Sequence, residues 1–269
     1  MTIRNSSLTV AILLSQVLYI TAFSQKPSLT PDEEVPRVFT RPDGTQVTAK
    51  IDRYSTLTGK VRGITKDGEY VEMPFDKIAP QNQKIILDWK MNQIVQSGDF
   101  DVTYIQKKGD SDTGFIKGTD IKVDNNTYYH ELTIENGEDI PVTGLTVEYA
   151  IAFEKVQREG RGLRDPQSGL GYRVATLPVM DIAAHEKKVV VTPPITLKKY
   201  ENVDSGDGYR GEGGGKSTET YEGVLFRFKR NGVTLRDVAN PPGIVDREFI
   251  FKPIPNETAP ESTGTPQAN

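Results

Sequence analysis

The sequence predicts a mainly β protein with two units: a small sheet with one C-terminal helix, followed by an antiparallel β-sandwich. Short segments in which apolar and polar residues alternate recur along the chain, and turn residues such as Gly, Asn and Asp separate them. An apolar stripe with helical spacing lies between residues 78 and 89, and helix signals vanish after residue 98. The 269 residues are enough for one large or two ordinary domains.

The first 24 residues have the pattern of a secretory signal peptide. An apolar run at residues 8–23 follows a short segment whose only charged side chain is Arg4, and a small residue, Ser24, stands at the expected cleavage position. The run is shorter than the roughly 20 residues that a membrane-spanning helix needs, which favours cleavage over a retained anchor. We expect cleavage near Ser24–Gln25, and a bacterial protein that is periplasmic or secreted.

Charge and cysteine content narrow the classes of partner. The formal net charge is −4 at pH 7, which gives the chain no general attraction to nucleic acid or to an anionic membrane. The chain has no cysteine, so it forms no disulfides and has no cysteine to acylate after the signal. Export without cysteine is more typical of a bacterial envelope protein than of an animal extracellular one. We expect contact with the membrane only through the transient signal.

The first predicted unit spans residues 37–91, after a polar, proline-containing linker at residues 25–36. It contains four short strands, and Asp67–Gly68 favours a two-residue hairpin turn between the third and fourth. Pro80 suits the first position of the helix that follows. The helix stripe should cover the sheet, and its tryptophan should supply much of the buried area. The stripe consists of Ile78, Ile85, Ile86 and Trp89.

This unit resembles the Sla1 homology domain 1 (SHD1) family, because a set of short motifs agrees with it in order and spacing. These motifs are Phe39–Thr40, Asp43–Gly44, Gly59–Val61, Lys66–Gly68 and Pro74–Ile78, the last leading into a helix that carries Gln83. Bacterial members often have Ser where this chain has Ala79 at the expected N-cap, and Ala weakens a helix end by ~1 kcal/mol.

The resemblance implies an SH3-like small barrel that binds a ligand and catalyses nothing. In the fungal endocytic protein that names the family, the domain recognises a short Asn-Pro-Phe-type peptide. That ligand is not transferred to this chain, because the cell compartment differs.

The second predicted unit, residues 98–253, is an antiparallel β-sandwich of seven to nine strands. Its strongest strand pattern spans residues 147–153, and Asn231–Gly232 favours a hairpin turn. Residues 132–153 loosely resemble two adjacent strands of an immunoglobulin-like or fibronectin-like exported domain, which implies a fold and no function. Residues 254–269 are rich in Pro, Thr, Ser and Glu and are expected to form a disordered tail.

Two long loops are the remaining candidates for function. Residues 206–217 contain a Gly-x-Gly-x-x-Gly spacing and end in Gly-Lys-Ser, but Arg210 stands where a phosphate loop needs glycine, and the required strand and helix are missing. A long hairpin loop is the better interpretation. Residues 157–172 carry three arginines, which could contact an acidic partner or a glycan.

The sequence indicates no catalytic residues, no metal site and no cofactor. His130 shares an apolar strand face and His185 lies in a turn, so zinc is improbable. The loop aspartates lack the spacing of a calcium loop; they are Asp110, Asp112, Asp204 and Asp207. Glu131 and Glu135 are interpreted as the solvent-facing side of a strand.

The leading hypothesis is therefore non-enzymatic binding or scaffolding in the bacterial envelope, with a protein or peptide that adds a strand to an open sheet edge. One alternative is a carbohydrate-active accessory module or enzyme that uses loops 157–172 and 201–218. A second alternative is a homo-oligomeric structural component of the envelope. The sequence does not identify the binding residues or the oligomeric state.

Overall fold

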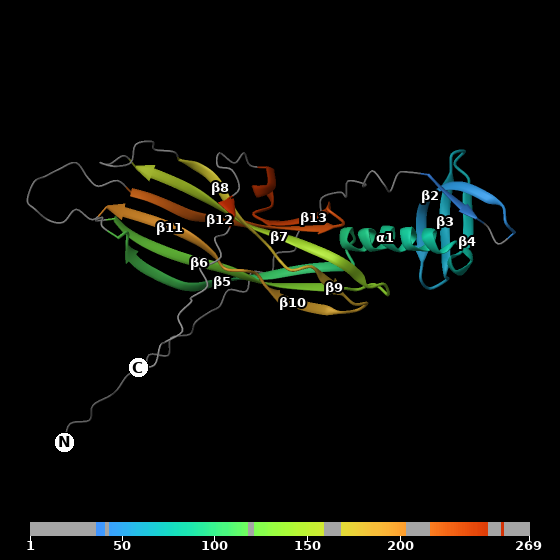
Figure 1. The fold of residues 1–269 in the computed structure, drawn as a ribbon, viewed down its shortest axis with the longest axis horizontal. Helices are drawn as coiled ribbons and strands as arrows, with labels where there is room; N and C mark the ends of the chain where they lie inside the picture. Colours follow the sequence, from blue (N-terminus) through green and yellow to red (C-terminus); the bar gives the residue numbers. More distant parts are fainter. Residues whose placement is uncertain are drawn as a thin grey trace, which may run out of the picture.

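The computed structural model describes residues 36–40, 43–117, 121–158, 168–202, 216–246 and 254–255. These residues confirm a mainly β chain with antiparallel sheets and one α-helix. Figure 1 shows an elongated molecule, with a small sheet at one end, a larger sheet at the other and the helix between them. The predicted signal peptide, most of the linker and most of the tail lie outside the described residues.

The small sheet has four antiparallel strands in the order β1-β2-β3-β4. They are β1 (Arg37–Thr40), β2 (Gln46–Ser55), β3 (Lys60–Thr65) and β4 (Tyr70–Pro74). The turn between β3 and β4 is one residue longer than the predicted two-residue hairpin: Gly68 N–H donates to the Thr65 carbonyl, Thr65 N–H donates to the Glu69 carbonyl, and only Gly68 has positive φ, at 83°. In the described part of the chain β1 and β4 do not pair, so the sheet is open and not a closed barrel.

The first turns of the single helix, α1 (Pro80–Gln96), pack on the apolar face of this sheet, so its core is buried although the sheet is not closed. The helix follows the short 3-10 turn η1 (Phe75–Lys77). Ala79 provides no side-chain cap, but the Gln83 amide donates to the carbonyls of Phe75 and Ile78 at 3.0 and 2.9 Å. Gln83 thus fixes the start of the helix that Ala79 leaves uncapped.

The two ends of α1 belong to two different cores. Ile86, together with Ile78 just before the helix, packs into the small core with residues such as Phe39 and Met73. Ile94 and Val95, near the end of the helix, are buried in the core of the larger sheet. The sequence predicted only the first contact. Trp89, expected to supply core area, belongs to neither core and is half-buried at the surface.

Ten strands and a short 3-10 helix make up the larger unit. They are β5 (Phe100–Phe115), β6 (Ile121–Asn136), β7 (Val142–Arg158), β8 (Gly169–Thr176), β9 (Met180–Ile182), β10 (Lys187–Val191), β11 (Ile195–Asn202), β12 (Lys216–Arg230), β13 (Val233–Asn240), η2 (Pro242–Asp246) and β14 (Ile254–Pro255). At the predicted turn between β12 and β13, Asn231 and Gly232 both have positive φ, at 51° and 79°. This geometry is that of a two-residue hairpin.

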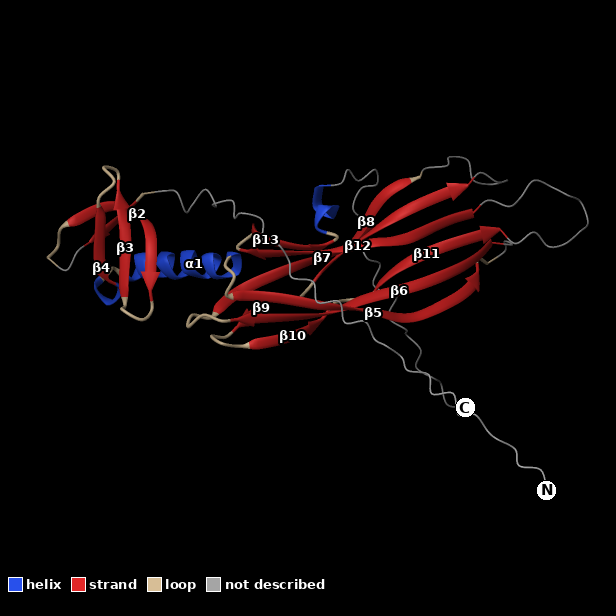
Figure 2. Cartoon of the chain, turned by 180° about the vertical axis from the view of Figure 1, so that it is seen from behind, coloured by secondary structure: helices blue, strands red, loops and turns tan. Residues whose placement is uncertain are grey.

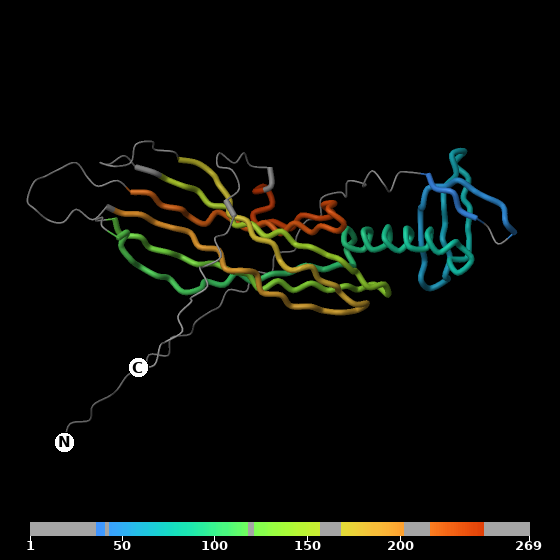
Figure 3. Tube along the Cα trace, in the orientation of Figure 1, coloured from blue at the N-terminus to red at the C-terminus, as the bar shows by residue number. Residues whose placement is uncertain are grey.

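The larger unit is two-layered near α1 and becomes a single sheet at its far end (Figures 1 and 3). Close to the helix, β5, β6 and β10 face β7, β9, β12 and β13 across an apolar core. At the far end, β11 pairs with both β6 and β12 and so joins the layers. The described strands confirm the predicted β-sandwich-like character, but its layers share one hydrogen-bonded network.

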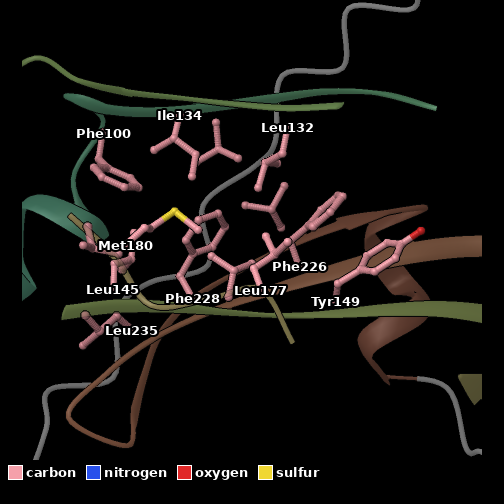
Figure 4. Packing of buried hydrophobic residues seen from close by; sticks show 14 of the residues in the cluster. Phe100, Leu132, Ile134, Leu145, Tyr149, Leu177, Met180, Phe226, Phe228 and Leu235 are labelled. Carbon is pink, nitrogen blue, oxygen red and sulfur yellow. The ribbon is translucent and has the colours of Figure 1, made fainter. Parts of the chain in front are cut away.

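Figure 4 shows side chains of the two layers meeting in this core. Phe100, Leu132 and Ile134 come from β5 and β6, and Tyr149 and Phe228 come from the opposite layer. These strands alternate buried and exposed residues, because successive side chains of a strand point to opposite faces. The core of the larger unit therefore lies where the layers are separate, next to α1.

Candidate functional site

An open cleft lies where the small sheet, α1 and the larger unit meet. It encloses about 410 Å³ and is lined by residues 52–56, mainly from β2, by Trp89, Lys90, Gln93 and Ser97, and by Glu138 of the β6–β7 turn. We call it the junction cleft. Clefts between two structural units are common places for ligand binding.

One wall of the junction cleft is a strand edge that is only partly paired. β1 pairs with residues 46–49 of β2, whereas the pairs of residues 50–55 in the described chain are all with β3. Figures 1 and 2, from opposite sides, both show β2 as the strand of the small sheet nearest to the larger unit. The second half of β2 therefore presents unpaired backbone groups, and an extended chain can pair with such an edge.

Several solvent-accessible polar groups around this edge have no hydrogen-bond partner within the described protein. Within the described residues, the Trp89 indole N–H, the Gln93 side-chain amide and the Arg53 guanidinium have no hydrogen-bond partner. Trp89 and Gln93 are four residues apart on α1 and so lie on the same face of the helix. The indole and the guanidinium only donate hydrogen bonds, and the amide both donates and accepts them. Together they suit a ligand that carries carbonyl or carboxylate oxygens.

The other charged groups of the junction cleft are paired, so they hold its shape. Asp52 accepts from Arg62 at 2.5 Å, and Lys90 donates to Glu138 at 2.9 Å. Tyr54 stacks on Phe75, with ring centroids 4.8 Å apart, and packs against both cores. Burial raises the pKa of the Tyr54 hydroxyl. The cleft is thus built on anchored side chains.

Arg230, at the end of β12, fastens α1 to the larger unit. Its side chain is only 5% exposed. It donates to the Asp88 carboxylate at 2.5 Å, to the Asn92 side-chain oxygen at 3.2 Å and to the Thr143 carbonyl at 2.7 Å. Because these acceptors lie on α1 and on β7, the orientation of the helix against the larger sheet is fixed.

A second, exposed contact joins the small sheet directly to the larger unit. Thr56 donates to Asp139 at 3.2 Å, and the other oxygen of Asp139 lies 2.8 Å from the His185 ring. The hydrogen bond with His185, followed by that from Thr56, lowers the pKa of Asp139. His185 was predicted to lie in a turn, and its φ of 56° agrees with that prediction.

His130 is fully buried, as its apolar strand face predicted. It lies where the single sheet divides into two layers, and it exchanges hydrogen bonds with Thr192 in the gap between β10 and β11. Its Nδ1 is 2.9 Å from the Tyr149 hydroxyl, while Nε2 has no partner in the described structure. Burial lowers the pKa of His130 to about 4 and raises that of Tyr149. This enclosed pair is interpreted as structural.

The other sequence candidates do not converge on a metal or catalytic site. No group of three or more His, Asp or Glu side chains in the described part of the chain could hold a metal ion. Asp110 and Asp112 are exposed on β5, and the other two loop aspartates lie outside the described residues. Glu135 lies 3.5 Å from Lys187 on the neighbouring strand, in keeping with a solvent-facing strand side.

Most of the two long loops, including residues 206–215 of the glycine-rich segment, also lies outside the described residues, whereas Lys216 and Ser217, predicted to belong to a loop, begin β12. Their ends are nevertheless adjacent, because Lys216 is paired in register with both Arg158 and Glu201. Both loops therefore leave the sheet at its far end, away from the junction cleft (Figure 1).

Local sequence patterns do not predict the junction cleft, because its walls come from three separate elements. The available signal was Trp89, a large aromatic side chain in a helix whose two ends serve different cores. No family model matches this chain, and no curated protein matches it significantly.

Proposed function

We propose that this protein is an exported, non-enzymatic binding or scaffold protein of the bacterial envelope, and that it binds an extended peptide segment of a partner protein in the junction cleft. The observation that carries this proposal is the partly unpaired edge of β2, which lies beside solvent-accessible donors of α1 that have no partner within the described residues. A peptide strand satisfies such an edge with its own backbone groups.

In the proposed complex, the peptide lies antiparallel or parallel to residues 50–55 of β2. Its backbone exchanges hydrogen bonds with that edge, and its side chains contact Trp89 and Tyr54. Trp89 and Gln93 donate to peptide carbonyl groups, and Arg53 adds a positive charge at the entrance. Because the cleft is already shaped by paired charges, little ordering of the protein is needed on binding.

We also propose that residues 37–91 form an SHD1-like module with an opened SH3-like sheet, and that the larger unit is related to immunoglobulin-like sandwiches. The motif order of the first unit supports the former, and the facing layers of β5–β6 and β7–β12 support the latter. Export is supported by the signal pattern of residues 1–24. A cell-fractionation experiment with N-terminal sequencing tests the location and the cleavage near Ser24–Gln25.

The peptide-binding proposal is tested with a library of random peptides displayed on phage and selected on the purified protein. Affinities of selected peptides are then measured by fluorescence polarisation. Trp89→Ala should weaken binding by about tenfold or more, whereas Phe115→Ala, which removes an exposed aromatic side chain at the far end of β5, should leave it unchanged.

Hydrogen–deuterium exchange then distinguishes strand addition from other modes of binding. Bound peptide should slow exchange at alternate amides of residues 50–55, because only the amides that face the open edge gain partners. Peptides that bind the Trp89→Ala variant as tightly as the wild type, or that give no protection on β2, would contradict the proposal.

A further inference from the structure

A second groove lies at the opposite end of the molecule, on the single-sheet part of the larger unit. It encloses about 330 Å³ and is lined by residues of β5, β6 and β11 and of the segment after β5. The lining residues are Asp112, Gly114, Phe115, Ile116, Val123, Asn125, Lys198 and Tyr200. We call it the distal groove. The even-numbered Leu132 and Ile134 of β6 point into the core of the larger unit. The residues of β6 that line the groove are odd-numbered, so their side chains lie on the opposite face of the sheet.

Strand register explains why these residues gather. Asp112, Asn125 and Lys198 are direct cross-strand partners, and they form one polar row across three strands. Gly114, Val123 and Tyr200 form the next row in the same way. A polar row and an apolar row thus run side by side across a rigid surface.

The apolar row is recessed at one end and flanked by an exposed apolar side chain. A Cβ added at Gly114 would meet nothing within 4 Å, so the surface is open there. Ile116, which follows β5, is 41% exposed, although large apolar side chains are usually buried. Tyr200 is half-exposed and offers both a ring face and a hydroxyl group.

The polar row offers a mixture of donors and acceptors without excess charge. The Asp112 carboxylate accepts hydrogen bonds, the Asn125 amide donates and accepts them, and the Lys198 ammonium donates them. Asp112 and Asn125 have no side-chain partner among the described residues. The positive and negative charges balance, so the groove suits an uncharged ligand that carries many hydroxyl groups.

Strand addition cannot occur inside this groove. At these positions β6 has β5 on one side and β11 on the other, so its backbone groups are already paired. Any ligand must therefore be recognised by side chains that rise from the sheet. A sugar ring fits this chemistry, because its C–H face packs on an aromatic ring while its hydroxyl groups exchange hydrogen bonds with planar polar side chains.

We propose that the distal groove binds a neutral oligosaccharide. Tyr200 contacts the apolar face of a sugar ring, and Asp112 and Asn125 bind its hydroxyl groups. The proposal goes beyond peptide binding in the junction cleft, and it does not depend on that function.

Isothermal titration calorimetry with short, uncharged oligosaccharides of glucose, mannose, xylose and N-acetylglucosamine tests the proposal on the purified protein. At least one series should bind, and Tyr200→Ala should weaken that binding by about tenfold. Asp112→Asn, at an exposed position that folding does not require, should weaken it severalfold. The matched control Tyr70→Ala, which removes an exposed tyrosine on β4, should bind as the wild type does.

Failure of every series to bind the wild-type protein would overturn the proposal, as would unchanged binding by both the Tyr200→Ala and Asp112→Asn variants. Thermal unfolding of each variant verifies that it is folded. Peptide affinity at the junction cleft, measured in the same samples, should be unaffected by the Tyr200→Ala substitution.

Discussion

At the scale of single residues, His130 combines full burial with a ring nitrogen that has no partner among the described residues. Tyr104, Tyr149 and Phe226 surround its ring, with centroid distances of 5.8, 5.5 and 5.6 Å. This buried environment solvates a positive charge less well than water does, so the folded protein favours the neutral imidazole.

His130 should make the fold sensitive to acid. The pKa of His130 in the folded protein is about 4, below the ordinary value of 6.5. The contribution of the neutral side chain to the free energy of unfolding is therefore complete above pH 6.5 and is lost as the pH falls towards 4. Between pH 7 and pH 5 this loss should amount to about 2 kcal/mol. Urea unfolding at several pH values should show a shallower dependence for His130→Phe. Equal pH dependence in the two proteins would contradict the assignment.

Gly223 should be required by the close approach of two neighbouring segments. It lies at the bulge of β12, and a Cβ there would lie 2.3 Å from the Asn240 carbonyl oxygen and 2.6 Å from an Ile244 methyl group. Gly223→Ala should therefore lower the free energy of unfolding by about 2 kcal/mol or more. Gly98→Ala, where a Cβ meets nothing within 4 Å, is the control and should change it little. Denaturant unfolding gives both values.

At the scale of elements, α1 is shared by two cores, and Arg230 holds its middle. Arg230→Met should lower the free energy of unfolding by about 3 kcal/mol, because it leaves the Asp88 carboxylate without its buried cation. Lys60→Met is the matched control, since Lys60 forms an exposed pair with Glu72 and should contribute less than about 1 kcal/mol. A similar loss in both variants would show that Arg230 has no special role.

Sequence patterns predicted the individual elements better than their partners. The turns at Asp67–Gly68 and Asn231–Gly232 depend on local backbone preferences; the second has the predicted two-residue form, and the first is one residue longer. Pro193 and Pro194 interrupt the chain between β10 and β11, because proline cannot donate to a strand ladder. Local patterns do not specify that β11 pairs with β12 beyond this interruption. They do not specify that Trp89 faces a cleft either, since both depend on contacts between distant segments.

At the scale of the whole molecule, the shared helix should make the two units unfold together. A fragment of residues 36–97 would expose Ile94 and Val95, which are fully buried in the larger core, and would lose the contacts of Arg230. Calorimetry of the whole protein should therefore show one transition, and the fragment should melt at a much lower temperature. Two separate transitions would indicate that the units are independent.

The merging of two layers into one sheet sets a fixed distance between the ends of the molecule. The small sheet and the far end of β11 are joined by α1 and by strands that run the length of the larger unit (Figure 1). A rigid body with a binding site at each end acts as a spacer. Once one site has bound its ligand, the other site is held within a fixed distance of that ligand. Between two surfaces, such a body would raise the effective concentration of the second attachment without any added contact energy.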